Sequence, residues 1–244
     1  MLLMLTAPAV GVFLFGAVRL WSIGPLMFLS FIGAAMCFAR PLAVPEQRTL
    51  RIPIGGWIWI LLLAYGALVS FRSAVPYEST IELLKVACYV AAYWAWTNIV
   101  DRPGRWRVLF GAFIVVVTLI AWYAVIQHGQ DSNMVLNLER PEQYGMRASG
   151  TYFCPNHFAN LLELVMPVCL ALLLLPAAGL PTRMLAGYGL VLCLPVMYLT
   201  ESRSGWIGTV AGLSVTAILI AWRKSRRAFA IMLVAIPLVV ALLA

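Results

Sequence analysis

The run FANLLELVMPVCLALLLLP, residues 158–176, is apolar over almost its whole length and is long enough to cross a bilayer. A helix needs roughly 20 mainly apolar residues to cross the hydrocarbon core of a membrane. The run follows directly on a polar segment, RASGTYFCPNH, residues 147–157. The sequence therefore predicts a membrane-spanning helix whose start carries polar and catalytic residue types at the bilayer surface.

Apolar runs of similar length recur along the chain, and the composition agrees with them. Hydrophobic residues make up 63% of the sequence and charged residues 11%, which lies outside the range of soluble globular domains. A helix satisfies its own backbone hydrogen bonds, as a chain in hydrocarbon must. We therefore expect an all-α, polytopic membrane helix bundle with about nine transmembrane helices, at 2–18, 21–38, 52–71, 80–99, 108–127, 158–176, 184–200, 204–222 and 228–244.

The Lys and Arg residues are distributed among the connections in the way that membrane topology predicts. The connections after the second, fourth, sixth and eighth spans hold eleven of them, and the other connections hold five. The positive-inside rule then puts the N-terminus in the cytoplasm. The same distribution accounts for the net charge of +8 without a basic patch for nucleic acid. We expect membrane lipids, and no nucleic acid, as partners.

The longest polar connection is HGQDSNMVLNLERPEQYGMRASGTYFCP, residues 128–155, which this topology places on the outward side. Long ordered loops are usually functional. The other connections are short, and no repeat or linker interrupts the spans, so residues 1–244 are expected to form a single transmembrane domain. The last span ends at Ala244 while it is still apolar, which is typical of the N-terminal part of a longer protein.

Three ionisable residues, Glu82, Lys85 and Glu163, fall inside predicted spans. A charge there costs about 3 kcal/mol, so each of them needs a reason. Ser79 precedes Glu82 with the spacing of a capping box, so this carboxylate can satisfy a helix start. Lys85 can pair with Glu82, or it can line a polar cavity that attracts an anionic ligand. Both interpretations of Lys85 stay open.

A helix that begins at Pro155 carries Asn156, Asn160 and Glu163 on one face. This polar stripe must face protein or water, so it either forms a buried hydrogen-bond network or lines a cavity, and we prefer the cavity for the two asparagines. His157 lies in the first turn, where the helix dipole favours a neutral ring. It is a candidate general base, although a capping or packing role explains it equally well because no carboxylate partner is visible.

The tight turn LTESRSG, residues 199–205, leads into a later span on the same outward side. A helix start with Ser202 and the guanidinium of Arg203 suits a phosphate or diphosphate, through oriented N–H groups and bidentate hydrogen bonds. An Arg203–Glu201 surface pair or a lipid headgroup contact is the alternative. Arg147 could help to clamp the same diphosphate, or it could be a structural residue of the loop.

The pairing of RASGTYFCPNHFANLLELVMP with YLTESRSGW resembles the O-antigen ligase and O-antigen polymerase superfamily of bacterial envelope glycosyltransferases. In that family a motif like G-T-x-x-x-P-N-H-x-A begins a helix after an outward loop, and a Ser-Arg-Gly-type motif follows at the outer end of a later helix. This chain has Ser-Arg-Ser-Gly instead, with Ser202 and Arg203 where the motif requires them. The resemblance runs from about Ile52 to the end of the chain.

The resemblance implies transfer of a glycan from a polyprenyl-diphosphate carrier to a hydroxyl of a glycan or lipid acceptor. The step belongs to cell-envelope polysaccharide or lipopolysaccharide assembly on the periplasmic side of the bacterial inner membrane, with no cofactor, nucleotide sugar or metal. Arg203 and Arg147 would stabilise charge on the leaving diphosphate. Family members carry a histidine proposed as the base in a large periplasmic loop after the spans seen here, so that role is not transferred to His157.

Two other functions stay open. A transporter or flippase for a lipid-linked glycan would use the three ionisable residues inside the spans as an ion path, whereas transfer needs charges at the outer rim. A truncated, non-catalytic membrane subunit is the third possibility, because the chain ends abruptly at Ala244. Convergence of Arg147, Asn156 and Arg203 on one outward cavity would favour transfer.

Overall fold

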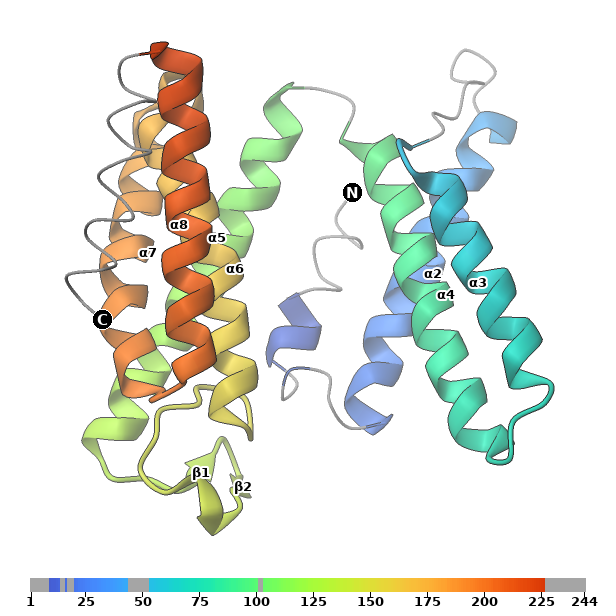
Figure 1. The fold of residues 1–244 in the computed structure, drawn as a ribbon, viewed down its shortest axis with the longest axis horizontal. Helices are drawn as coiled ribbons and strands as arrows, with labels where there is room; N and C mark the ends of the chain where they lie inside the picture. The colour runs from blue at the N-terminus through green and yellow to red at the C-terminus, as the bar shows by residue number, and fades with distance from the viewer. Residues whose placement is uncertain (1–8, 14–15, 17–19, 44–52, 101–102, 227–244) are drawn as a thin grey trace. The chain divides into compact units, whose positions relative to one another are not determined.

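The computed structural model describes residues 9–13, 16, 20–43, 53–100 and 103–226, and most of them are helical (Figure 1). The predicted all-α architecture is confirmed for this part of the chain, where a short hairpin is the only β-structure. The elements, in chain order, are α2 (Leu20–Ala43), α3 (Gly56–Ser70), α4 (Pro76–Ile99), α5 (Pro103–Gly129), β1 (Met134–Val135), β2 (Leu138–Glu139), η3 (Glu142–Tyr144), α6 (Pro155–Leu174), η4 (Pro176–Ala178), α7 (Leu180–Leu199) and α8 (Arg203–Lys224).

Five of the described helices are long and apolar enough to cross a membrane, as expected for a multi-pass membrane protein. Each of them coincides with one of the predicted spans. Their apolar segments are Ser22–Ala39 in α2, Gly104–Gly129 in α5, and the whole of Pro155–Leu174, Leu180–Leu199 and Arg203–Lys224.

The other four predicted spans are not among these five helices. The span predicted at 52–71 is a helix, α3, but it has only 15 residues, which reach roughly 22 Å at 1.5 Å per residue. The span predicted at 80–99 lies in α4, which has 24 residues but carries three charged residues in its first half. Most of 2–18 and all of 228–244 lie outside the described residues. The total of nine therefore stays a prediction.

Contacts between helices divide the chain into two compact units, residues 1–106 and 107–244. In the first unit α4 is the central helix and packs against both α2 and α3. Ala34 of α2 and Ala95 of α4 are both buried at their contact, which brings these helices close. On the α3 side, a Cβ at Gly56 would lie 3.0 Å from the indole of Trp94. The single-domain organisation expected from the sequence stays a prediction.

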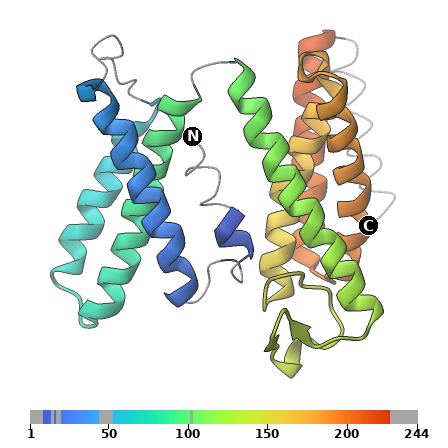
Figure 2. The same ribbon diagram turned by 180° about the vertical axis from the view of Figure 1, so that it is seen from behind.

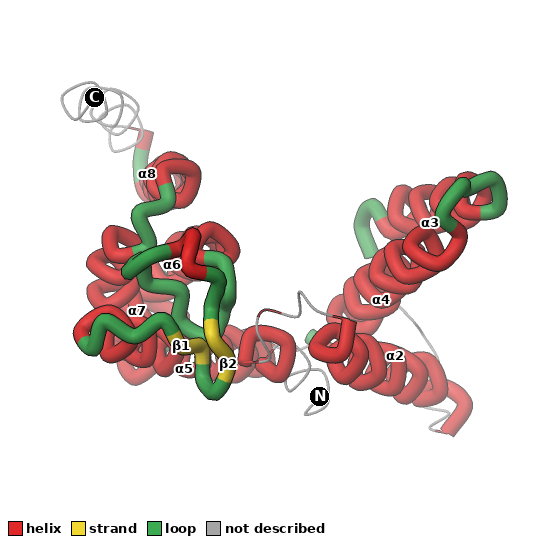
Figure 3. Tube along the Cα trace, turned by 90° about the horizontal axis from the view of Figure 1, so that it is seen from below, coloured by secondary structure: helices red, strands yellow, loops and turns green. Residues whose placement is uncertain are grey.

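In the second unit α6 is the central helix, with α8 on one side and α7 and α5 on the other (Figures 2 and 3). Its buried side chains, among them Phe158, Leu162 and Met166, form much of the core of this unit. Gly189 of α7 completes the packing, because a Cβ there would lie 3.0 Å from Ile114 of α5.

A row of glycines on α8 lets it approach α6 closely. The contacts, glycine first, are Gly205 with Ala159, Gly208 with Glu163 and Gly212 with Pro167. In a membrane, helices associate through such close packing and not through a hydrophobic driving force. Gly208 and Gly212 therefore form a small-residue face on α8, and Gly205 extends it to the start of the helix.

We expect Gly205→Ala to lower the free energy of unfolding by about 1–3 kcal/mol, the usual cost of overpacking. The added methyl group would lie 2.8 Å from the Cβ of Ala159 and 3.0 Å from the sulfur of Met197, and the first of these atoms cannot move aside. The matched control is Gly111→Ala in α5, where a Cβ meets nothing within 4 Å. Titration with SDS in mixed micelles, followed by circular dichroism, measures both variants. Equal stabilities would contradict the packing described.

Candidate functional site

At one end of the second unit, α5 and α7 end and α6 and α8 begin (Figure 1). The connection of residues 130–154, called the loop below, lies against these helix ends (Figure 3). Arg147, Asn156, His157, Ser202 and Arg203 are all at this end. The structure thus brings together the two sequence segments that suggested a function. That this end faces outward stays a prediction.

Side chains at the end of α5 anchor the loop. The buried amide of Gln127 donates a hydrogen bond to the carbonyl oxygen of Met134 at 2.8 Å. His128 Nδ1 lies 2.8 Å from the carbonyl oxygen of Met146, so this nitrogen carries the proton because a carbonyl oxygen only accepts. The sequence suggested no role for His128. In the structure it anchors the loop to the end of α5.

Arg140 lies at the centre of the hydrogen bonds within the loop. Its side chain is 2% exposed, and it donates to the carbonyl oxygens of Arg147 and Gly145 at 2.6 Å each, to Ser149 Oγ at 2.8 Å and to Asn133 Oδ1 at 3.3 Å. These acceptors are neutral, and no carboxylate in the described part of the chain pairs with Arg140. Burial lowers the pKa of Arg140, and the nearby charge of Arg147 lowers it further. Sequence reasoning missed this residue.

Arg147 links the loop to two helices. Its Nη2 donates to Asn156 Oδ1 at the start of α6, at 2.7 Å, and its Nε donates to the carbonyl oxygen of Thr200 after α7, at 2.8 Å. The next residue adds a backbone bond, from Ala148 N to the carbonyl oxygen of Leu199 at 2.8 Å. The guanidinium is therefore held by the protein from two directions.

The turn between α7 and α8 is tight and well bonded. Glu201 adopts the left-handed conformation, with φ of 51°, and so reverses the chain. Ser202 caps α8, because its Oγ accepts from Gly205 N at 3.3 Å. It is 1% exposed, so its hydroxyl serves the helix start. The expected role of Ser202 in binding a diphosphate stays a prediction.

The start of α8 leaves two kinds of donor, a guanidinium and backbone N–H groups, without a partner in the described part of the chain. Arg203 is exposed, and its side chain makes no hydrogen bond or ion pair within the described residues, so the alternative pair with Glu201 does not form. The backbone N–H groups of Arg203 and Ser204 precede the first intrahelical bond, from Trp206 N to the carbonyl oxygen of Ser202 at 3.0 Å. Such N–H groups are directed at whatever lies before the helix.

The polar stripe predicted on α6 does not act as one unit. Asn156 is bonded to Arg147, whereas Asn160 and His157 are exposed and their side chains have no partner among the described residues. Glu163 is half-buried and lies against Gly208 of α8, on the packing side of the helix. No hydrogen bond between described residues connects the three stripe positions.

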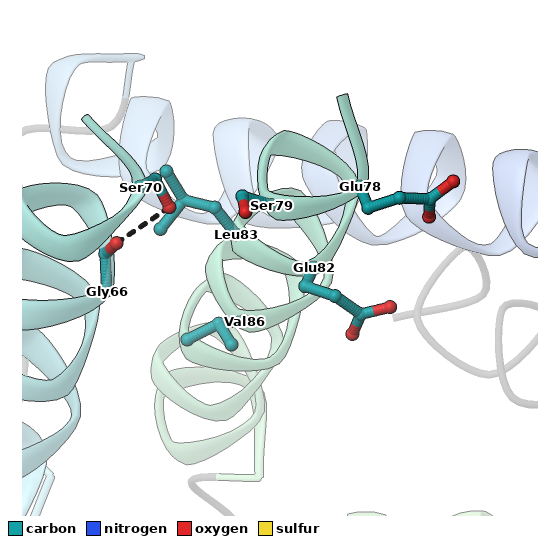
Figure 4. Close-up of a pocket in the computed structure, with 7 residues that line it drawn as sticks. All are labelled: Gly66, Ser70, Glu78, Ser79, Glu82, Leu83 and Val86. Atoms are coloured by element: carbon teal, nitrogen blue, oxygen red, sulfur yellow. Dashed lines mark hydrogen bonds between the residues drawn. The ribbon is translucent and has the colours of Figure 1, made fainter. Parts of the chain in front are cut away.

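In the first unit, a cavity of 310 Å³ lies between α3 and α4, and Ser70, Ser79 and Glu82 are among the residues that line it (Figure 4). Lys85 is not among them. It pairs with Glu82 at 2.5 Å, so the ion-pair interpretation of Lys85 is confirmed. The predicted capping box is wrong, because α4 already begins at Pro76, whose fixed φ suits the first helical position.

Among the described residues, no three His, Cys, Asp or Glu side chains are grouped so that they could hold a metal ion. Comparisons of the chain with models of protein families, with characterised proteins and with solved structures found no match. The resemblance to the O-antigen ligase and polymerase superfamily therefore depends on the two motifs of this chain.

We expect Arg140→Met to destabilise the loop by about 2 kcal/mol or more, because buried oxygens lose their donors and each unsatisfied buried group costs about 1–3 kcal/mol. Hydrogen–deuterium exchange should show faster exchange at Ala148 N, which bonds to Leu199. The control is Arg223→Met, in the last turn of α8 at the other end of that helix. Unchanged protection of Ala148 would show that Arg140 does not hold the loop.

Proposed function

We propose that this protein is a glycosyltransferase of the bacterial inner membrane, similar to O-antigen ligases. It would move a glycan from a polyprenyl-diphosphate carrier to a hydroxyl of a glycan or lipid acceptor on the periplasmic side. The observation that carries the proposal is the start of α8, where the Arg203 guanidinium and two backbone N–H groups have no protein partner within the described residues. Donors arranged in this way bind phosphate groups.

The chemistry of transfer fits such a site. The acceptor oxygen forms a bond to the anomeric carbon of the glycan, and the bond between that carbon and the diphosphate oxygen breaks. Negative charge then develops on the departing diphosphate, where a fixed cation and oriented N–H groups stabilise it most. The proton of the acceptor hydroxyl goes to a base. His157 is exposed at the same end and stays a candidate for that role.

The surface of α8 supports a lipid carrier over a soluble phosphate. Apolar side chains on the first turns of the helix are exposed, Trp206 at 36%, Ile207 at 73% and Val210 at 40%. They follow directly on Arg203, so one helix offers a cation and then an apolar face. A polyprenyl diphosphate has the same order of parts, a charged head followed by a hydrocarbon chain.

A transporter of the lipid-linked glycan is the second candidate, and Glu163 favours it. This carboxylate lies within a membrane-spanning helix and has no partner among the described residues, which is typical of proton and ion paths. The other two charges inside predicted spans do not support this function, because Lys85 and Glu82 pair with each other. Sealed proteoliposomes separate the candidates. Movement of the intact carrier that Glu163→Gln abolishes and Arg203→Ala leaves unchanged would favour transport.

Arg203→Ala should reduce glycan transfer by about 100-fold or more, the usual effect of removing one donor that stabilises developing charge. The assay uses the full-length protein in nanodiscs, an undecaprenyl-diphosphate-linked glycan and an acceptor, and it follows the product by mass. The control is Arg223→Ala, which removes the same residue type from the opposite end of α8. Transfer by Arg203→Ala at the wild-type rate would overturn the proposed role of this end of the helix.

A further inference from the structure

We infer that Asn156 binds the ligand through its side-chain NH₂ group. Arg147 is the positioning residue that turns this group away from the protein. The inference deepens the proposed function and depends on it. It gives Arg147 a different task from that of a diphosphate clamp.

The orientation of the Asn156 amide follows from the chemistry of its partner. A guanidinium only donates hydrogen bonds, so the Asn156 atom that lies 2.7 Å from Arg147 Nη2 must be the oxygen. The nitrogen then lies at the other end of the amide. Asn156 is exposed, and this NH₂ group has no acceptor among the described residues. An exposed amide with one end fixed offers a donor of defined direction.

Arg147 is held too firmly to be a mobile cation. Its Nε is bonded to the carbonyl oxygen of Thr200, which is 0% exposed. Its own carbonyl oxygen accepts from the buried Arg140 at 2.6 Å. Backbone and side chain of Arg147 are thus both fixed by buried partners. In the described structure the residue acts as a brace between the loop, α6 and the turn before α8.

Through Arg147, Asn156 is linked to the turn that leads into the proposed phosphate site. Thr200, which Arg147 holds, belongs to the turn that leads through the capping residue Ser202 into Arg203. Arg203 and its neighbouring N–H groups offer charge to a diphosphate, whereas Asn156 offers a neutral NH₂ donor. A neutral donor suits an oxygen of the carrier-linked glycan, either a diphosphate oxygen or an oxygen of the first sugar.

Asn156→Asp tests the inference with little change of shape. An aspartate keeps an oxygen for Arg147, now as a charge-assisted bond, but it cannot donate. We expect affinity for the undecaprenyl-diphosphate-linked glycan in nanodiscs to fall about tenfold or more, and the melting temperature to stay the same or rise. Gln143→Glu is the matched control. It makes the same change of amide to carboxylate at an exposed position of the loop, and we expect wild-type affinity.

A double-mutant cycle tests whether Arg147 acts through Asn156. If Arg147 only directs the amide, the single variant Arg147→Met weakens binding, but the double variant binds no more weakly than Asn156→Asp. If Arg147 contacts the diphosphate itself, the two losses multiply and its positioning role is overturned.

Binding of sugar-free undecaprenyl diphosphate shows which ligand oxygen accepts the hydrogen bond from Asn156. A loss with both probes indicates a diphosphate oxygen, and a loss confined to the glycan-linked probe indicates a sugar oxygen.

The outcomes separate this inference from the function on which it depends. Binding that is weakened by Arg203→Ala but unchanged by Asn156→Asp would overturn the inference and leave the proposed function standing. Absence of carrier binding by the wild-type protein would overturn both. A fall in affinity for Gln143→Glu as large as that for Asn156→Asp would mean that added negative charge is the cause, and this would also overturn the inference.

Discussion

The hydrogen bond from Arg147 Nε to the carbonyl oxygen of Thr200 connects segments that are 53 positions apart in the chain. This bond ties the loop to the turn before α8, and the bond from the same guanidinium to Asn156 adds the start of α6. Arg140 makes this bond possible, since it gathers the surrounding carbonyl groups and fixes the backbone of Arg147. Two arginines with neutral partners therefore hold together the end of the bundle at which every proposed ligand contact lies.

Hydropathy along the chain predicted much of the fold, because the cost of placing a helix in a membrane is close to a sum over its own residues. This is why α5 to α8 were found close to their correct positions. Gly208 and Gly212 have the helical spacing that favours close approach of a neighbouring helix in a membrane, and the structure identifies that neighbour as α6. The Ser79–Glu82 spacing mispredicts the start of α4, because Pro76 already fixes the first turn of this helix.

The site was less predictable, because its hydrogen bonds depend on how the loop folds. Arg140 lies between Glu139 and Pro141 in the sequence, and nothing in that context indicates burial, since its acceptors are spread from Asn133 to Ser149. From the sequence, Arg203 is the main candidate cation for a diphosphate, and Arg147 is either a second one or a structural residue of the loop. The structure distinguishes them, by giving Arg147 two protein acceptors and Arg203 none within the described residues.

The contact between Glu163 and Gly208 has a consequence for how this protein can change over evolution. The carboxylate occupies the space into which a side chain at position 208 would extend. A larger residue at 208 is compatible with the present helix spacing only when position 163 becomes smaller or its side chain turns aside. We therefore expect the two positions to vary together among related sequences, so that the volume shared by α6 and α8 is conserved although neither residue need be.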